Sequence, residues 1–211
     1  MRSLGSLHIL RIDSSVQREQ SITRKLGNEV VRRLLLEYPN ATLTLRDLAD
    51  PVDLIDADWV HANLTDPAKR QVKQRTTLFG SDRMVEELDV ADVVVLNVPV
   101  YNFSIPAAIK AWIDMICRAR LSFRYTESGP QGMLRDRPVY LVMASGGMNF
   151  GSPADFASSY LRHIFDFIGI REMRMVLAER TTSGVNVSER VALDMLNRWM
   201  PIEPGTAAAC A

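Results

Sequence analysis

The sequence predicts a three-layer α/β sandwich, in which a five-stranded parallel sheet carries helices on both faces. Two observations predict this fold class. Short runs rich in valine, isoleucine and leucine alternate with longer segments of helical periodicity, which is the pattern of successive βαβ units. The central runs are almost continuously apolar, as strands buried on both faces are. The 211 residues are enough for one sizeable core, so we expect a single domain spanning 1–211.

The first half of the chain is predicted to hold three strands and two long helices. We expect strands at 7–12, 41–46 and 92–97 and helices at 21–37 and from 66 or 67 to 88. Leu26, Val30 and Leu34 lie on one face of the first helix. The second strand alternates apolar and polar residues, which favours an edge position. Between it and the second long helix, the aspartate-rich segment 47–64 is expected to be a surface excursion with a short helix.

The second half is predicted to hold two more strands and three helices. We expect helices at 106–118, 153–168 and 188–200, strands at 138–144 and 171–179, a loop or hairpin at 121–137, and a loop at 181–187. Pro106 suits a first helical turn. Gly169 is expected to end the second of these helices, and Ser188 to cap the third. The tail 201–211 is expected to fray.

The number of strands indicates how the sheet is wound. Five strands without a sixth fit the flavodoxin-like order 2-1-3-4-5 better than a dinucleotide-binding Rossmann domain. In that order the winding reverses between the first and third strands. Ligands of open α/β sheets bind beyond the carboxyl ends of the strands at such a switch point. The loops that follow the first, third and fourth strands are therefore the predicted site.

Composition narrows the class of function. Lys plus Arg and Asp plus Glu both number 25, so no overall field attracts nucleic acid or an acidic membrane. No apolar run approaches the roughly 20 residues of a membrane span, and we identify no signal peptide. Two cysteines, Cys117 and Cys210, are too few for a disulfide framework, and the three histidines are scattered, so we expect no metal site and cytoplasmic residence. Cys117 is expected to be a small core residue.

The loop after the first strand is rich in hydroxyl groups. Ser14, Ser15, Ser21 and Thr23 surround the start of a helix, where free N–H groups and the helix dipole favour a phosphate. Arg18 is a candidate for added positive charge. Ordinary helix capping is the alternative reading of these residues. Because the chain contains neither a Gly-x-Gly-x-x-Gly nor a Walker motif, the loop predicts a mononucleotide rather than a dinucleotide or a nucleoside triphosphate.

The other two loops suit a flat ring system. Pro99, Tyr101 and Phe103 follow the third strand, with Asn102 placed to offer a backbone N–H to a flavin N5. Ser145-Gly146-Gly147 follows the fourth strand and offers N–H groups to the flavin N1–C2=O edge, where charge gathers on reduction. Taken alone, each loop is also consistent with an ordinary turn. Together the three loops predict non-covalently bound FMN.

A group of arginines lies outside these loops. They are Arg118, Arg120, Arg124, Arg135 and Arg137. We expect them to form a solvated face, and the alternative is a contact with the phosphates of a visiting pyridine nucleotide.

The chain resembles the FMN-dependent NADH azoreductases, a flavodoxin-like family of homodimeric quinone and azo-compound reductases, over most of its length and most strongly from Val98 to Gly184. The resemblance rests on Val98 to Ile105, on Leu121 to Gly132 with its Phe-Arg-Tyr-Thr-Glu stretch, on Ala144 to Gly147, and on Phe167 to Ile170. It implies FMN as cofactor, NAD(P)H as co-substrate, and a homodimer whose active site lies at the interface.

The resemblance also assigns site residues. It places phosphate contacts at Ser15, Ser21, Ile22 and Thr23, ring contacts at Val100, Tyr101, Asn102 and Phe103, and pyrimidine-edge contacts at Ala144, Ser145, Gly146 and Gly147. Four positions depart from the family pattern: Ile22 replaces a glutamine, Ala144-Ser145 replaces Ser-Arg, and Asn149 replaces a histidine. These departures bear on substrate range and on the choice between NADH and NADPH.

The resulting hypothesis is a ping-pong oxidoreductase. NAD(P)H delivers hydride to the flavin and leaves, and a quinone or azo compound then takes two electrons from the same face. Asn102, Gly146 and Gly147 tune the flavin, and no side chain is an obligatory catalyst. One alternative is a flavodoxin-like electron carrier without an organic substrate. A response-regulator-like domain is disfavoured because Asn97 and Arg180 stand where an acid and a lysine are needed.

Overall fold

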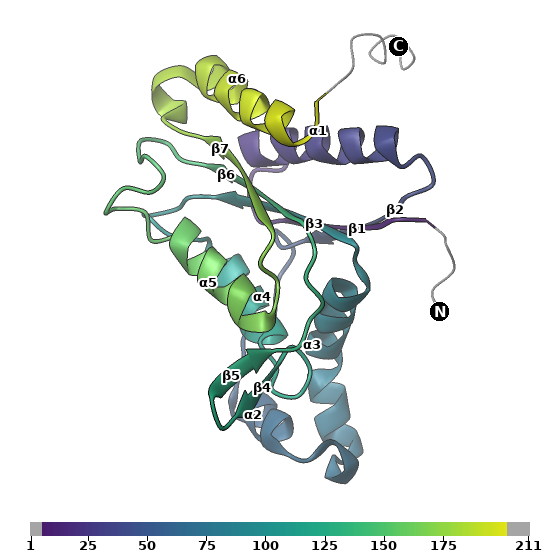
Figure 1. The fold of residues 1–211 in the computed structure, drawn as a ribbon. Coiled ribbons are helices and arrows are strands. Elements are labelled where there is room, and N and C mark those ends of the chain that lie inside the picture. The colour runs from purple at the N-terminus through teal and green to yellow at the C-terminus, as the bar shows by residue number, and fades with distance from the viewer. Residues whose placement is uncertain (1–5, 202–211) are drawn as a thin grey trace.

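Five strands form one parallel sheet in the order β2-β1-β3-β6-β7, which is the predicted order 2-1-3-4-5 (Figure 1). The computed structural model describes residues 6–201, so all of the predicted tail except Pro201 lies outside the described residues. The strands are β1 (His8–Asp13), β2 (Thr42–Asp47), β3 (Val93–Pro99), β6 (Val139–Ala144) and β7 (Met173–Ala178). As predicted from its alternating pattern, β2 lies at an edge.

Helices cover both faces of this sheet (Figure 1). One face carries α1 (Ile22–Glu37) and α6 (Thr181–Trp199). The other carries α3 (Val72–Val90), α4 (Ala107–Ile116) and α5 (Ser158–Ile168). The short α2 (Ala57–Leu64) and the 3-10 turn η1 (Pro67–Lys69) pack beside α3, and strands β4 (Phe123–Thr126) and β5 (Gly129–Gly132) form the predicted hairpin insertion.

The sheet separates two apolar cores. Ile9 and Val95 point toward α1 and α6, where Leu26, Val30 and Leu196 are buried. Their neighbours along the strands, such as Leu10 and Leu96, point to the other face and meet residues of α3, α4 and α5. Successive side chains of a strand alternate between faces. The apolar runs of the sequence are continuous because both faces of each central strand are covered.

Three helices, α3, α5 and α6, begin more than one residue away from their predicted starts. The predicted helix from 66 is broken: η1 ends at Lys69, and α3 starts only after Gln71, whose side chain forms a capping box with Gln74. Helix α5 starts at Ser158 rather than 153, because the Asp155 carboxylate accepts hydrogen bonds from the backbone N–H groups of Ala157 and Ser158.

The predicted loop at 181–187 is instead helical. Helix α6 begins at Thr181, has non-helical backbone at Gly184 and continues to Trp199. The prediction that Ser188 caps a helix start is wrong. Its hydroxyl lies within α6 and donates hydrogen bonds to the carbonyls of Glu179 and Gly184, which join the end of β7 to the helix.

The prediction of a solvated arginine face is wrong for two of its members. Arg118 and Arg137 are buried. Arg118 forms an ion pair with Asp82 at 2.9 Å and lies over the Trp59 ring, so it joins α2 and α3 to the end of α4. Arg137 donates hydrogen bonds to the carbonyl of Asp89 in the last turn of α3, at 3.0 Å, and to that of Ala91, just after the helix, at 2.8 Å. Both guanidinium groups therefore connect α3 to neighbouring segments on its face of the sheet and are not available to a visiting nucleotide.

Candidate functional site

The sheet register brings the three predicted loops to one edge. Asp13 at the end of β1 is level with Asn97 of β3, and Pro99 is level with Ala144 at the end of β6. Two backbone hydrogen bonds fix the exits: Ser14 N–H donates to Asn97, and Val100 N–H donates to Ala144. The loops that follow these strands must therefore start side by side at the switch point between β1 and β3.

A cavity of about 350 Å³ lies between these loops. Its lining includes eight of the predicted site residues: Ser15, Ser21, Ile22, Thr23, Val100, Tyr101, Ala144 and Gly146. The remaining lining residues are Val16, Gln17, Gln20, Pro99 and Thr181. The predicted residues Asn102, Phe103, Ser145 and Gly147 belong to the same loops but are not part of this lining.

The first loop presents hydroxyl groups at the start of α1. Ser21 is the N-cap, and its Oγ accepts a hydrogen bond from Arg24 N–H and lies 3.0 Å from the Thr23 hydroxyl. The first hydrogen bond of the helix runs from Lys25 N–H to the Ser21 carbonyl, so the N–H groups of Ile22 and Thr23 precede the helical ladder. The cavity thus receives two hydroxyls, free backbone donors and the positive end of the helix dipole.

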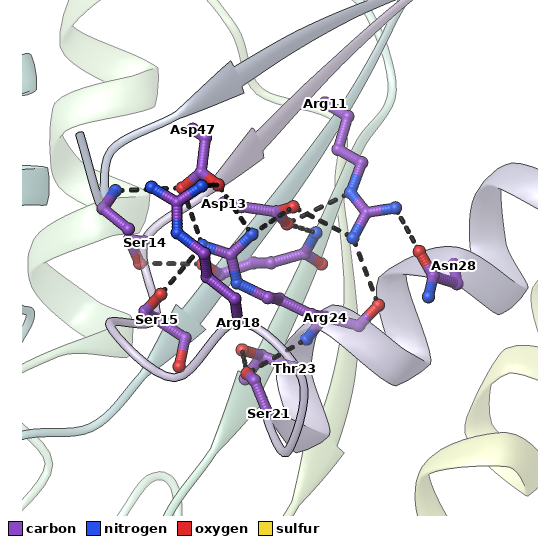
Figure 2. A network of polar contacts seen from close by, with 12 residues as sticks. Arg11, Asp13, Ser14, Ser15, Arg18, Ser21, Thr23, Arg24, Asn28 and Asp47 are labelled. Atoms are coloured by element: carbon purple, nitrogen blue, oxygen red, sulfur yellow. Dashed lines mark hydrogen bonds and ion pairs between the residues drawn. The ribbon is translucent and has the colours of Figure 1, made fainter.

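The arginines of this segment are paired with aspartates (Figure 2) and are not part of the cavity lining. Arg18, predicted to add charge at the phosphate, instead forms ion pairs with Asp50 at 2.6 Å and Asp47 at 3.5 Å. Arg24 pairs with Asp47 at 2.6 Å and Asp13 at 3.1 Å. The Arg24 hydrogen bond lowers the pKa of Asp47 below its ordinary value. Among the described residues, those that line the cavity carry no formal charge.

The second loop turns tightly after Tyr101. Tyr101 and Ser104 exchange two backbone hydrogen bonds of 3.0 and 3.1 Å, so Asn102 and Phe103 form a two-residue turn. Both have positive φ, at 50° and 68°. This conformation is uncommon for asparagine and strained for phenylalanine, and such strain is concentrated at functional sites. The turn leaves the Phe103 side chain 59% exposed beside the cavity.

The third loop is attached to the start of α6. The carbonyls of Ser145 and Gly146 accept hydrogen bonds from the N–H groups of Thr181 and Thr182. The Ser145 hydroxyl turns inward and accepts a hydrogen bond from Met148 N–H at 2.9 Å. A Cβ atom on Gly146 would lie 3.2 Å from the Thr182 side chain, which would have to move by a few tenths of an ångström to accommodate it. Asn149, which departs from the family pattern, accepts a hydrogen bond from Arg180 at 3.0 Å.

Thr181 is a lining residue that the sequence analysis missed. The sequence pattern predicts only a loop at 181–187, although Thr181 stands three residues beyond the end of β7. The predicted sheet order could have indicated this residue. In that order the fifth strand lies next to the fourth, so its carboxyl end lies at the same edge of the sheet as the cavity. Gln17 and Gln20 lie inside the predicted phosphate loop, and nothing in their residue type distinguished them.

The donor set fits FMN. Hydroxyls and helix N–H groups at the start of α1 match a phosphate, and Pro99, Val100 and Tyr101 add largely apolar side chains to the lining. Ala144 and Gly146 place backbone at the third side without a bulky side chain. Cys117 lies outside this site at the end of α4. Cys117 is partly buried against the core, and this burial raises the pKa of its thiol to about 12, so it lacks the low pKa of a nucleophile.

An open parallel sheet with a mononucleotide-sized cavity at its switch point defines a flavodoxin-like protein. The family model described as "Flavodoxin-like fold" matches residues 7–200, and the chain belongs to this family, confirming the predicted fold. Among the described residues, we find no helix of the length and apolarity that a membrane crossing requires.

Two sequence relatives carry the same name. The chain is 42% identical over 170 residues to FMN-dependent NADH:quinone oxidoreductase 1 of Colwellia psychrerythraea, covering 81% of this chain and 88% of the relative. It is 40% identical over 185 residues to the protein of the same name from Jannaschia sp., covering 88% and 94%. These relatives confirm the predicted resemblance to FMN-dependent NADH oxidoreductases.

Solved structures share the fold. An azoreductase from Bacillus anthracis superposes with a TM-score of 0.80 at 24% identity, covering 91% of this chain and 96% of that one. An FMN-dependent NADH-azoreductase from the same species, in complex with FMN, superposes with a TM-score of 0.79 at 23% identity, covering 92% and 99%. At this identity the similarity concerns the fold alone.

Proposed function

We propose that this chain is an FMN-dependent NADH:quinone oxidoreductase that also reduces azo compounds. The observation that carries the proposal is the convergence of three loops, each predicted from sequence to suit one part of FMN, on a single cavity at the switch point. The names of the relatives at about 40% identity support the same activity. The single-domain organisation and a cytoplasmic location are part of this proposal.

Different residues bind different parts of FMN. Ser15, Ser21 and Thr23 hold the phosphate, Val100 and Tyr101 flank the ring, and the backbone of Gly146, with that of Gly147 next to the lining, donates to the pyrimidine edge. Bound FMN supplies the chemistry of accepting hydride from NADH and passing two electrons to a quinone or azo compound. Asn102, in its strained turn, orients the loop beside the reacting edge. Donor and acceptor use one face in turn, so the kinetics are ping-pong and need no obligatory side-chain catalyst.

We further propose a homodimer whose interface completes the active site. Phe103 and Phe156 are 59% and 62% exposed, and Phe156 N–H donates to the Phe103 carbonyl. Two large exposed apolar side chains next to each other, one of them two residues after the lining residue Tyr101, favour coverage by another protein surface. Sedimentation of the FMN-loaded protein tests this: a dimer that becomes monomeric in a Phe103→Asp variant is expected. A monomeric native protein contradicts it.

Absorption and steady-state kinetics test the activity. The purified protein, incubated with FMN and desalted, is expected to retain the visible flavin bands. It is then expected to oxidise NADH much faster with a quinone present, with parallel double-reciprocal plots, and NADPH is compared under the same conditions. Bound FMN without quinone-stimulated oxidation would favour the electron-carrier alternative. A protein that retains no FMN under saturating titration refutes the proposal.

A further inference from the structure

Arg24 is a buried cation directly beside the proposed phosphate site that does not face it. It is the third residue of α1 and is 8% exposed. Its neighbour Thr23 lines the cavity, but Arg24 is not part of the lining. Figure 2 shows the guanidinium directed away from Ser21 and Thr23, toward the ends of β1 and β2. A buried arginine so close to an expected dianion, yet turned from it, calls for a different role than charge neutralisation.

The guanidinium joins four segments at once. It binds both carboxylate oxygens of Asp47 at the end of β2, at 2.9 and 2.6 Å. It binds Asp13 at the end of β1, at 3.1 Å. Its Nη2 also donates to the carbonyl of Ser15, at 2.8 Å, while the Arg24 backbone N–H holds the Ser21 hydroxyl. A planar fork with several donors is suited to such simultaneous contacts.

The carboxylates are themselves held in place. Asp13 accepts hydrogen bonds from Asn97 at 2.6 Å and from Arg11 at 3.1 Å, and Asp47 accepts one from Ala49 N–H at 2.9 Å. The Asp47 hydrogen bond raises the pKa of Arg24, so the pair stays charged at neutral pH. The guanidinium is therefore a fixed point to which the loop attaches.

The bond to Ser15 fixes the direction of one peptide unit. The carbonyl and the following N–H of a trans peptide point in opposite directions, and the described chain has no cis peptide bond. Since the Ser15 carbonyl points to Arg24, the Val16 N–H points away from it. Ser15, Val16 and Gln17 all line the cavity. If this peptide turned over, a carbonyl oxygen would face the anion in place of a donor.

We propose that Arg24 is a positioning residue for phosphate recognition: it holds the Ser15–Val16 peptide and the first turn of α1 in the orientation that receives the phosphate, and so makes the site select FMN over riboflavin. The inference rests on the proposed function, because it assumes that FMN occupies this cavity. The side chains that line the cavity carry no charge, so they cannot select the phosphate by charge. This selectivity is assigned instead to Arg24, which lies outside the cavity.

The experiment compares the dissociation constants of FMN and riboflavin, measured by quenching of flavin fluorescence. Arg24→Lys keeps the charge but lacks the fork, and Arg24→Gln also removes the charge. Arg33→Lys is the matched control. Arg33 is a buried arginine on the same helix, bound to Glu29, Asn197 and the Met200 carbonyl, far from the cavity. Thermal unfolding of every variant reports its stability.

We expect Arg24→Lys to weaken FMN at least tenfold and to leave riboflavin within about twofold, so that the selectivity collapses. Arg33→Lys should lower the unfolding temperature and keep the native selectivity. Equal weakening of both flavins by Arg24→Lys would assign Arg24 a merely structural role and overturn the inference. If both Arg24 variants fail to fold, Asp47→Asn is measured instead. It must lower the FMN-to-riboflavin selectivity, and an unchanged value overturns the inference.

The proposed function fails in a distinguishable way. A native protein that binds neither flavin, or binds both equally, refutes the phosphate site itself. A native protein that selects FMN, and loses this selectivity when Ser21 and Thr23 are replaced but keeps it when Arg24 is replaced, leaves the site intact and refutes only the role of Arg24.

Discussion

At the scale of single residues, the proposed phosphate site relies on neutral donors. Because Arg18 and Arg24 are paired with aspartates, the hydroxyls of Ser21 and Thr23 and the helix N–H groups remain for the anion. We expect the double variant Ser21→Ala, Thr23→Ala to weaken FMN at least tenfold, since each hydrogen bond to a charged group is worth roughly 1.5–3 kcal/mol. Flavin fluorescence titration measures it. Ser14→Ala is the control, because the Ser14 hydroxyl donates to the Asn97 carbonyl. An unchanged FMN affinity in the double variant contradicts the assignment.

Asn102 can be tested without changing its backbone. Its φ of 50° is one that glycine adopts easily, so Asn102→Gly should keep the turn. We expect slower reduction of bound FMN by NADH with little change in FMN affinity, because glycine has more conformational freedom than asparagine and holds the loop less firmly at the reacting edge. Stopped-flow bleaching of the flavin absorbance measures the rate. Native-like bleaching would remove Asn102 from the mechanism.

Arg180 occupies a left-handed conformation, with φ 54° and ψ 40°. A non-glycine residue in this region costs on the order of 1 kcal/mol. Arg180→Gly should therefore raise the urea midpoint, whereas Arg180→Ala, which loses the same contact with Asn149 but keeps the strain, should not. If both variants are equally stable, strain at this residue is not significant.

At the scale of elements, Gly132 shows how the hairpin is attached to the sheet domain. A Cβ atom at Gly132 would lie 2.2 Å from the backbone nitrogen of Gly169 at the end of α5. Gly132→Ala should therefore move the hairpin away from α5 and lower stability by about 1–3 kcal/mol, as overpacking does.

The matched control is Gly80→Ala in α3, where no atom lies within 4 Å of the added Cβ. Alanine is the better helix former, so this variant should gain about 0.5–1 kcal/mol. Urea unfolding of both variants measures the difference. A Gly132→Ala variant as stable as the native protein would show that the hairpin adapts without cost.

Helix and strand periodicity were enough to predict the layers of this fold. The central runs are apolar on both sides, and α1 buries Leu26 and Val30 as its pattern indicates. The element boundaries that were wrong depend on single contacts. The Asp155 carboxylate delays α5, and the Ser188 hydroxyl bonds to Glu179 rather than to a helix start. Both residues are ordinary capping types, and local sequence does not tell which backbone group each one meets.

The sequence was enough to predict which loops meet at the site, but not which charged side chains face it. The sheet order alone brings Ser15, Tyr101 and Gly146 to one cavity. The sequence could not show that Arg18 and Arg24 are neutralised, because Asp47 and Asp50 lie on another strand and loop. Ion pairing between distant segments is a property of the tertiary structure, so the predicted role of Arg18 was wrong.

At the scale of the whole molecule, pH links stability to groups spread over both layers. Hydrogen bonds from arginines lower the pKa of Glu29 and Asp47. The unfolded chain therefore binds more protons than the folded protein near pH 4, so stability falls as the pH drops below about 4. On the basic side, burial raises the pKa of Cys117 to about 12. The unfolded thiol ionises near 8.5, so stability falls again above about pH 8.5.

Two variants test separately the fall in stability at low pH (the acid limb) and the fall at high pH (the basic limb), in the flavin-free protein. Asp47→Asn removes one shifted carboxylate, so the decline below about pH 4 should become shallower while the basic limb stays unchanged. Cys117→Ala removes the buried thiol, so the decline between about pH 8.5 and 10 should flatten while the acid limb stays unchanged. Buried Tyr140, whose pKa is also raised, still lowers stability above about pH 10. Urea midpoints measured from pH 3 to 11 test both. A Cys117→Ala variant with an undiminished basic decline would show that the thiol is solvated in the folded protein.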